Sequence, residues 1–262
     1  MTASPSGARA IDTLSPAGGP EAAKKALDRS TLGIVQLDRP RLDHLPYCGL
    51  VRALLGKQGF KLDFNALSPD AAIALVADKL LGPGSFAAER AALAADIAAL
   101  AAFAGGLVGA APSIAIRTYF APGDLVWHVD RLRERDAFRL LWPIGRPAGM
   151  MVTAADNIDA ALYRAYMQRE YPLLGRLDTR VMQQGGSVET LWPHRPVQVA
   201  AMQRGDFPFV RDPQAVWQID PGAASIHRVD TPRRPGTFHR SCWANRATPG
   251  LQIVITVASD GA

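Results

Sequence analysis

Residues 124–131 read DLVWHVDR, and within them a single residue separates His128 from Asp130. If this stretch is a β-strand, successive side chains point to opposite faces, so the imidazole of His128 and the carboxylate of Asp130 project to the same side. An imidazole and a carboxylate together suit Fe(II), Mn or Zn. One further histidine from a distant segment would complete a set of two histidines and one carboxylate, which leaves coordination positions open for other ligands.

Two later histidines are candidates for that third ligand. His227 lies in ASIHRV and His239 in TFHRS, and both are far enough along the chain to fold back onto the first pair. We predict that His239 is the ligand, because PGAASIHRV then forms the strand before it; His227 is the alternative. His44 and His194 are predicted to lie on the surface or in loops.

The second half of the chain predicts the β-structure that must position these side chains. Short apolar stretches alternate with Gly, Pro and Asp, a pattern typical of a sandwich or barrel. The candidate strands are SIAIRTYF, LVWHVD, AFRLLWPI, GMMVTA, PVQVAAM, AVWQID, AASIHRV, GTFHRS and LQIVITVA. We expect a β-roll over residues 112–258, with an inserted helix over residues 156–174.

The first half of the chain predicts a helical layer over residues 45–110. One helix has Ser68 as its N-cap, Pro69 as its first residue and Gly82 at its end, and a second helix follows from Ser85. Residues 1–30 are rich in Ala, Ser, Pro and Gly and show little apolar periodicity, so we expect a flexible leader there. Residues 31–262 are predicted to form a single catalytic domain.

Composition narrows the class of protein. The chain has 262 residues, of which 48% are hydrophobic, enough for a substantial core. Its formal charge is +5, but basic and aromatic residues do not interleave as a nucleic-acid stacking surface requires. Cys48 and Cys242 form no CxxC pair, which argues against a disulfide framework. With no apparent signal peptide or membrane span, we expect a cytoplasmic protein without nucleic-acid or membrane partners. The sequence does not set the oligomeric state.

The stretches RTYFAPGDLVWHVD and HRSCWANRATPG resemble the Fe(II)/2-oxoglutarate-dependent dioxygenase superfamily, over about residues 113–257. The second stretch is similar to phytanoyl-CoA-hydroxylase-like members. The resemblance implies an α+β fold in which a double-stranded β-helix, a jelly roll of the cupin type, is backed by the N-terminal helical layer. It also implies Fe(II) bound by His128, Asp130 and His239, 2-oxoglutarate as cosubstrate, and hydroxylation of a small-molecule substrate with O2.

The sequence departs from the superfamily pattern at the residue expected to bind the cosubstrate. In that superfamily an arginine at the start of the last strand usually holds the distal carboxylate of 2-oxoglutarate, since a guanidinium can donate two parallel hydrogen bonds. Here Leu251 stands at that place. The candidates for this task are three arginines and two polar residues, namely Arg246, Arg139, Arg117, Ser241 and Asn245.

Two other interpretations stay open. In the first, the protein is a cupin-like metalloenzyme that does not use 2-oxoglutarate. In the second, it is a non-catalytic β-sandwich binding module. In the binding module, the loops RLRERD and DTPRRPG would contact an acidic partner with a salt-sensitive affinity, carried by Arg133, Arg135, Arg233 and Arg234. If the protein is an oxygenase, aromatic residues near the inserted segment are candidates to line its substrate pocket: Tyr163, Tyr166 and Trp192.

Overall fold

The computed structural model describes residues 11–57, 61–64, 68–117, 126–134, 136–145, 149–174, 207–241 and 251–259. Its α-helices are α1 (Gly19–Arg29), α2 (Cys48–Leu55), α3 (Pro69–Leu81), α4 (Ala87–Gly106) and α5 (Ala160–Leu174). Its strands are β1 (Asp12–Leu14), β2 (Ile34–Leu37), β3 (Lys61–Phe64), β4 (Ser113–Arg117), β5 (Ala137–Ile144), β6 (Met151–Thr153), β7 (Val216–Gln218), β8 (Ala224–Arg228), β9 (Phe238–Arg240) and β10 (Leu251–Ala258).

Within the described residues, the strands form two sheets. The larger is seven-stranded with the order β1-β2-β8-β5-β10-β4-β3, and the smaller is three-stranded with the order β7-β6-β9. Only the β1–β2 pairing among these strands is parallel. Strands that are neighbours in the large sheet are thus often far apart in the sequence, which brings residues near 140, 226 and 254 together.

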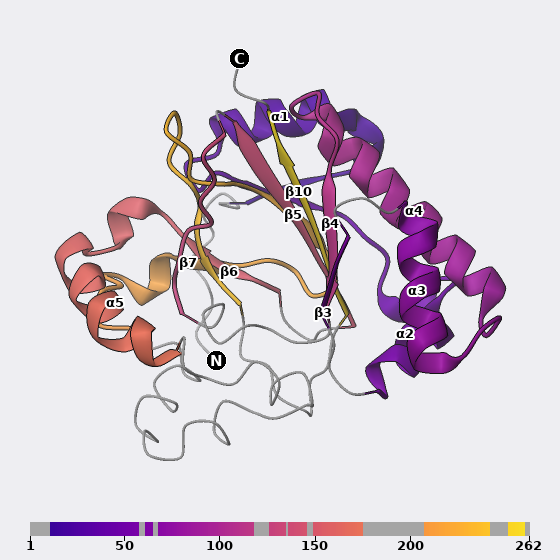
Figure 1. Ribbon diagram of the computed structural model, residues 1–262. Coiled ribbons are helices and arrows are strands. Elements are labelled where there is room, and N and C mark those ends of the chain that lie inside the picture. The colour runs from indigo at the N-terminus through magenta and orange to yellow at the C-terminus, as the bar shows by residue number, and fades with distance from the viewer. Residues whose placement is uncertain are drawn as a thin grey trace, which may run out of the picture.

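The α-helices from the N-terminal half cover one face of the large sheet (Figure 1). Helices α1, α2 and α4 contact strands β2, β5 and β10. Alternate residues of β5, such as Leu140 and Trp142, are buried in a core cluster with Leu93 and Ile97 of α4. The period of two along the strands therefore separates an apolar, helix-covered face from a second face that looks toward the small sheet.

The second face of the large sheet packs against the small sheet and its connections. Ile34, Leu141 and Val254 from the large sheet share a buried cluster with Val152 of β6 and with Ile219. The overall arrangement confirms the predicted α+β composition: helices, a seven-stranded sheet, and a smaller sheet on its other side. None of the described helices has both the length and the apolar character needed to span a membrane.

The expected flexible leader over residues 1–30 is wrong for residues 11–30. Residues 19–29 form α1, in which Ala23, Ala26 and Leu27 are fully buried against the core. These positions have helical spacing, but two are alanines, which give a weak apolar signal in a sequence. The Arg228 side chain also donates hydrogen bonds to the carbonyls of Leu27 and Ser30, so β8 binds the end of this helix.

The predicted helices are present, with small differences at their ends. Helix α3 begins at Pro69, and Ser68 accepts a hydrogen bond from the backbone of Ala71 as its N-cap. The inserted helix α5 begins at Ala160 rather than near residue 156, because the Asp159 side chain accepts hydrogen bonds from the first turn.

Most predicted strands also contain an observed one. Strand β5 occupies the whole of AFRLLWPI, and β10 the whole of LQIVITVA. The prediction that LVWHVD is a regular strand is wrong for its described part, since residues 126–130 make only an isolated bridge. PVQVAAM lies outside the described residues. Strands β1, β2 and β3 were not predicted from the sequence.

Candidate metal centre

His128 and His239 lie directly opposite each other on two paired chain segments. The His128 backbone N–H donates to the His239 carbonyl at 2.9 Å, and the His239 N–H donates to the His128 carbonyl at 3.0 Å. Such opposed residues carry their side chains on the same face. The two ring centroids are accordingly 4.4 Å apart, although the segment that carries His128 is too short to count as a strand.

A second backbone contact positions Asp130. Its carbonyl accepts from the Asp230 N–H at 2.7 Å, in the loop that connects β8 to β9. Gly236 permits this loop to fold tightly, because a Cβ at that residue would lie 2.5 Å from the Asp230 backbone nitrogen. The loop thereby ties the position of Asp130 to the start of β9, the strand that carries His239.

Ligand atoms of His128, Asp130 and His239 all lie within 4.8 Å of one another. His239 Nε2 is 3.5 Å from Asp130 Oδ2. Adjacent ligands around a cation with bonds of about 2.1 Å are separated by about 3 Å, so a small inward movement of these side chains fits them around one divalent ion. The predicted pair and the preferred distal histidine are therefore brought together.

Both histidines of this group present the nitrogen that a metal requires. His128 Nδ1 lies 2.8 Å from the Val126 carbonyl, and His239 Nδ1 lies 2.9 Å from the Thr237 carbonyl. A carbonyl only accepts hydrogen bonds, so each Nδ1 carries the proton and each Nε2 keeps its lone pair. Hydrogen bonds of this kind orient metal-binding histidines and fix their tautomer.

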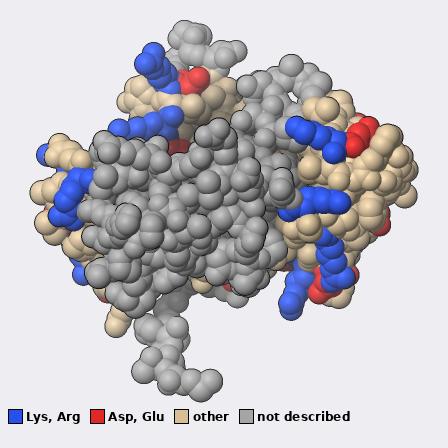
Figure 2. All heavy atoms as spheres, turned by 60° about the horizontal axis from the view of Figure 1, so that its bottom comes forward, with Lys and Arg blue, Asp and Glu red and all other residues tan. Residues whose placement is uncertain are grey.

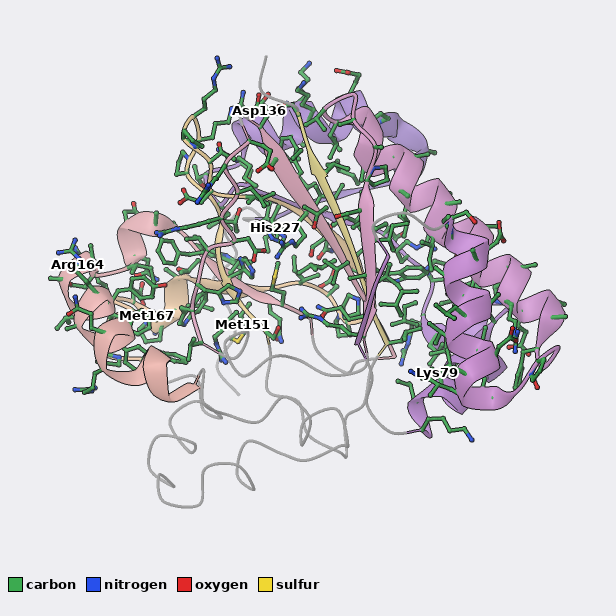
Figure 3. The ribbon with its side chains drawn as sticks, viewed as in Figure 1. Lys79, Asp136, Met151, Arg164, Met167 and His227 are labelled. Atoms are coloured by element: carbon green, nitrogen blue, oxygen red, sulfur yellow. The ribbon has the colours of Figure 1, made fainter. Side chains whose placement is uncertain are left out.

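His227, the alternative ligand, occupies a different position. Its Nε2 is 3.1 Å from Asp130 Oδ2, and its ring is fully buried between the two sheets (Figure 3). Because the ionised Asp130 only accepts, His227 Nε2 must carry the proton. That nitrogen is then a donor to the carboxylate and not a metal ligand, which favours His239 over His227.

The surroundings keep the carboxylate ionised and the buried imidazoles neutral. Burial alone would raise the pKa of Asp130, but the His227 hydrogen bond and the positive charge of Arg139 hold it well below its usual range. Burial lowers the pKa of His227 and, more strongly, that of His239. A carboxylate beside neutral imidazoles is the protonation state in which such groups bind a metal.

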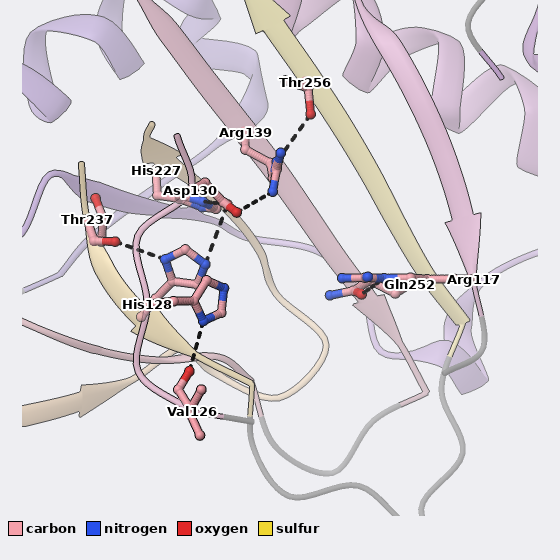
Figure 4. A network of polar contacts seen from close by, with 10 residues as sticks. Arg117, Val126, His128, Asp130, Arg139, His227, Thr237, Gln252 and Thr256 are labelled. Carbon is pink, nitrogen blue, oxygen red and sulfur yellow. Dashed lines mark hydrogen bonds and ion pairs between the residues drawn. The ribbon is translucent and has the colours of Figure 1, made fainter. Parts of the chain in front are cut away.

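Arg139 contacts the candidate metal site through an ion pair with Asp130. Its Nη1 is 2.5 Å from Asp130 Oδ1, and its Nε donates to the Thr256 hydroxyl at 3.2 Å. Figure 4 shows Asp130 between Arg139 and His227. Arg139 was predicted as a cosubstrate ligand, but its guanidinium forms an ion pair with Asp130. Nothing in the sequence pattern connected Thr256 with the site.

Arg117 lies on the same side of the large sheet as the histidine cluster (Figure 4). Its Nε donates to Gln252 Oε1 at 2.6 Å across the β4–β10 pair. Gln252 is the first residue of β10 that faces the site, because Leu251 is buried in the helix-covered core. The side chain of Leu251, where an arginine was expected, thus lies on the helix-covered face, and Gln252 is a site-facing residue that the sequence pattern did not indicate.

Most of the remaining predicted site residues lie outside the part of the chain that the structure describes. Ser241 is buried just after β9, and its role stays a prediction. Asn245, Arg246, Trp192 and His194 lie outside the described residues.

Tyr163 and Tyr166, two of the predicted pocket aromatics, pack into a core cluster. Tyr163 of α5 makes edge contacts with Phe209 and Phe238, and Tyr166 packs against Phe207 and Phe209. These rings pack α5 against Phe238 of the small sheet, in the buried cluster that also contains Val126 and Trp127.

The basic loops make ion pairs within the chain. Arg234 lies 2.7 Å from Asp28 and 3.5 Å from Asp136, and Arg131 lies 3.2 Å from Asp230. In the view of Figure 2, Lys and Arg occur in several separate places on the described surface, with Asp or Glu beside many of them. His44 is exposed, as predicted.

Comparison with known proteins finds no matching family model and no match among curated proteins. Similar solved structures include the dioxygenase for auxin oxidation 1 from Arabidopsis thaliana as a complex with 2-oxoglutarate, with 10% identity, a TM-score of 0.49, and coverage of 96% of this chain and 93% of that one. The rice dioxygenase for auxin oxidation has 13% identity, a TM-score of 0.45, and coverage of 95% and 83%. AAD-2 in complex with Mn(II) and N-oxalylglycine has 15% identity, a TM-score of 0.37, and coverage of 98% and 92%. At these scores the assignment of an activity rests on the site itself.

Proposed function

We propose that His128, Asp130 and His239 bind one Fe(II) ion and that the protein is a 2-oxoglutarate-dependent oxygenase that hydroxylates a small molecule. The observation that carries the proposal is the convergence of two imidazole Nε2 lone pairs and one carboxylate, with each imidazole fixed through Nδ1 on a backbone carbonyl. Two histidines and one carboxylate with open positions are the ligand set of non-haem Fe(II) oxygenases.

The arrangement of strands supports the same proposal. The ligands come from two segments that run beside each other, while Asp130 also reaches residues of β5 and β8 in the large sheet. We interpret the two facing sheets as the double-stranded β-helix that the sequence resemblance implies. The metal position would then lie between the sheets, where Leu141, Val152 and Val254 provide an apolar wall.

The chain's own residues would orient the ion and limit its access to water. His128 and His239 would each give Nε2, Asp130 would give an oxygen, and the carbonyls of Val126 and Thr237 would hold the rings in place. Bound there with 2-oxoglutarate, Fe(II) would activate O2, placing one oxygen atom in the substrate and the other in succinate, with release of CO2. The apolar surroundings would protect the reactive site.

We further propose that Arg117 and Gln252 hold the distal carboxylate of 2-oxoglutarate. This proposal is supported by the position of Arg117 on the site-facing side of the sheet, where Gln252 accepts a hydrogen bond from its Nε and so orients the guanidinium. A guanidinium oriented in this way is suited to a carboxylate. Asn245, Arg246 and Ser241 remain candidates for additional hydrogen bonds.

Anaerobic titration tests metal and cosubstrate together. Fe(II) followed by 2-oxoglutarate should give a weak visible charge-transfer band, because that band requires the oxo acid to chelate the iron. The band should be absent from Asp130→Ala, while circular dichroism shows that the fold is kept. A wild-type protein that binds Fe(II) without developing the band contradicts the use of 2-oxoglutarate and favours a cupin-like metalloenzyme. A wild-type protein that binds no divalent metal contradicts both.

A further inference from the structure

We propose that Arg139 and His227 are positioning residues that restrict Asp130 to a single metal-binding oxygen. The inference rests on the proposed metal centre and adds a role for two residues that are not ligands. Asp130 is approached from both sides, with Arg139 from β5 at Oδ1 and His227 from β8 at Oδ2. Both residues come from one cross-strand pair of the large sheet, in which Arg139 lies opposite His227.

The two carboxylate oxygens of Asp130 have different surroundings. Oδ1 is 2.5 Å from Arg139 Nη1, and that guanidinium is also held by Thr256. Oδ2 faces the centre of the cluster, at 3.5 Å from His239 Nε2. Side-chain exposure is 26% for Arg139 and 13% for Asp130, so the ion pair is largely removed from solvent. Oδ2 is therefore the oxygen placed to meet a cation, while Oδ1 is occupied by the guanidinium.

The burial and hydrogen bonding of the His227 ring differ from what a purely structural role requires. Its side chain has no exposed surface, and its Nδ1 has no hydrogen-bond partner among the described residues. A buried polar atom without a partner opposes folding, and an apolar residue would avoid this at the same place. The only polar contact described for the ring is Nε2–H to Asp130, so orientation of the carboxylate is the function that its chemistry supports.

Restriction to one oxygen has a direct consequence for the reaction. With Asp130 bound through Oδ2 alone, the cation keeps room for a two-point chelate of an oxo acid and for one further ligand such as oxygen. A carboxylate bound through both oxygens would take the position that this further ligand requires. Arg139 would prevent that by keeping Oδ1, and His227 would fix the plane of the carboxylate.

Crystals loaded with Mn(II) test the role of Arg139. In the wild type, one Asp130 oxygen should lie at about 2.2 Å from Mn(II), with the other still on Arg139. In Arg139→Gln, both oxygens should bind the ion. The control is Arg234→Gln, which removes the same charge from an exposed ion pair and should keep the one-oxygen mode.

Mn(II) binding measured by electron paramagnetic resonance tests His227. His227→Phe should weaken Mn(II) affinity about 10- to 100-fold, while the melting temperature of the metal-free protein stays close to that of the wild type. His227→Gln keeps an N–H donor and should recover most of the affinity. If His227→Phe lowers the melting temperature without changing the affinity, or if His227→Gln recovers none of it, the role of His227 is structural and the inference is overturned.

The results of these experiments distinguish a failure of this inference from a failure of the proposed function. Wild-type crystals with both Asp130 oxygens on Mn(II), or Arg139→Gln crystals that keep a single oxygen, would overturn the inference and leave the metal centre standing. Wild-type protein that binds no Mn(II) would overturn the metal centre and the inference with it.

Discussion

The two faces of the seven-stranded sheet are made by the same strands but carry side chains of different chemical character. On β5, Leu140 and Trp142 enter the helix-covered core, whereas Arg139 faces the small sheet and contacts Asp130. On β10, Ile253 faces the helices, whereas Gln252 faces Arg117. One face is apolar and stabilises the fold, and the other combines apolar residues with a few charged or polar groups that converge. Alternation along a strand thus lets one rigid element serve both purposes.

The largest effect on stability is expected on the helix-covered face. Trp142 is fully buried, packs edge-on against Tyr47 and lies under the Arg39 guanidinium. Trp142→Ala should lower the free energy of unfolding by about 3–5 kcal/mol, measured by urea denaturation. The protein that remains folded should bind Mn(II) with unchanged affinity. A loss of affinity without loss of stability would contradict the separation of the two faces.

The next effect is expected on the opposite face, at the proposed cosubstrate anchor. Arg117→Gln removes the cation and should weaken 2-oxoglutarate binding to the Fe(II) protein by about 2–3 kcal/mol. Isothermal titration under anaerobic conditions measures this, with Arg234→Gln as the charge-matched control. Metal affinity should not change, since Arg117 makes no described contact with the ligand group. Unchanged 2-oxoglutarate affinity would exclude Arg117 as the anchor.

The stability of the metal-free protein should depend on pH through the buried histidines. The pKa values of His227 and His239 are lowered in the folded state, so below about pH 6.5 the unfolded chain binds more protons. Stability should therefore be full above this pH and fall as the pH decreases, by up to about 1.4 kcal/mol per pH unit for each histidine. The lowered pKa of Asp130 means that its contribution is lost only at more acidic pH.

Denaturation by urea between about pH 7 and pH 5 measures this dependence. His227→Gln should reduce the slope, and His44→Gln, which changes an exposed histidine, serves as the control. A slope that is the same in the wild type and in His227→Gln would contradict the assignment of a neutral, buried imidazole at residue 227.

The smallest effect is expected at a helix end in the helical layer. Ser68→Ala removes the side-chain oxygen that accepts from Ala71 and should lower the free energy of unfolding by about 1 kcal/mol. Thermal unfolding measures the change, and Mn(II) affinity should stay the same. A Ser68→Thr variant keeps the hydroxyl and should recover most of the stability.

The sequence was sufficient for elements with strong local signals. Ser68, Pro69 and Gly82 bound a helix by capping and backbone preferences that act within a few residues, and the long apolar runs of β5 and β10 match their strands. Helix α1 was missed because its buried face relies on small alanines, and its packing partners lie far away in the sequence.

The site was only partly predictable for a similar reason. His128, Asp130 and His239 were found from residue type, spacing and a family resemblance. The partners of Asp130 depend on the β5–β8 register, which places Arg139 opposite His227 and which no local pattern encodes. The face on which Gln252 lies likewise follows from where β10 begins, and a shift of one residue exchanges the faces.

The most direct test of the central claim is the position of a bound ion. Crystals grown with Mn(II) and measured at the manganese absorption edge should show one anomalous peak at bonding distance from His128 Nε2, His239 Nε2 and one oxygen of Asp130. A peak coordinated by His227 in place of His239 would correct the ligand assignment. The absence of a peak between these side chains in protein saturated with Mn(II) would contradict the metal centre and the oxygenase function built on it.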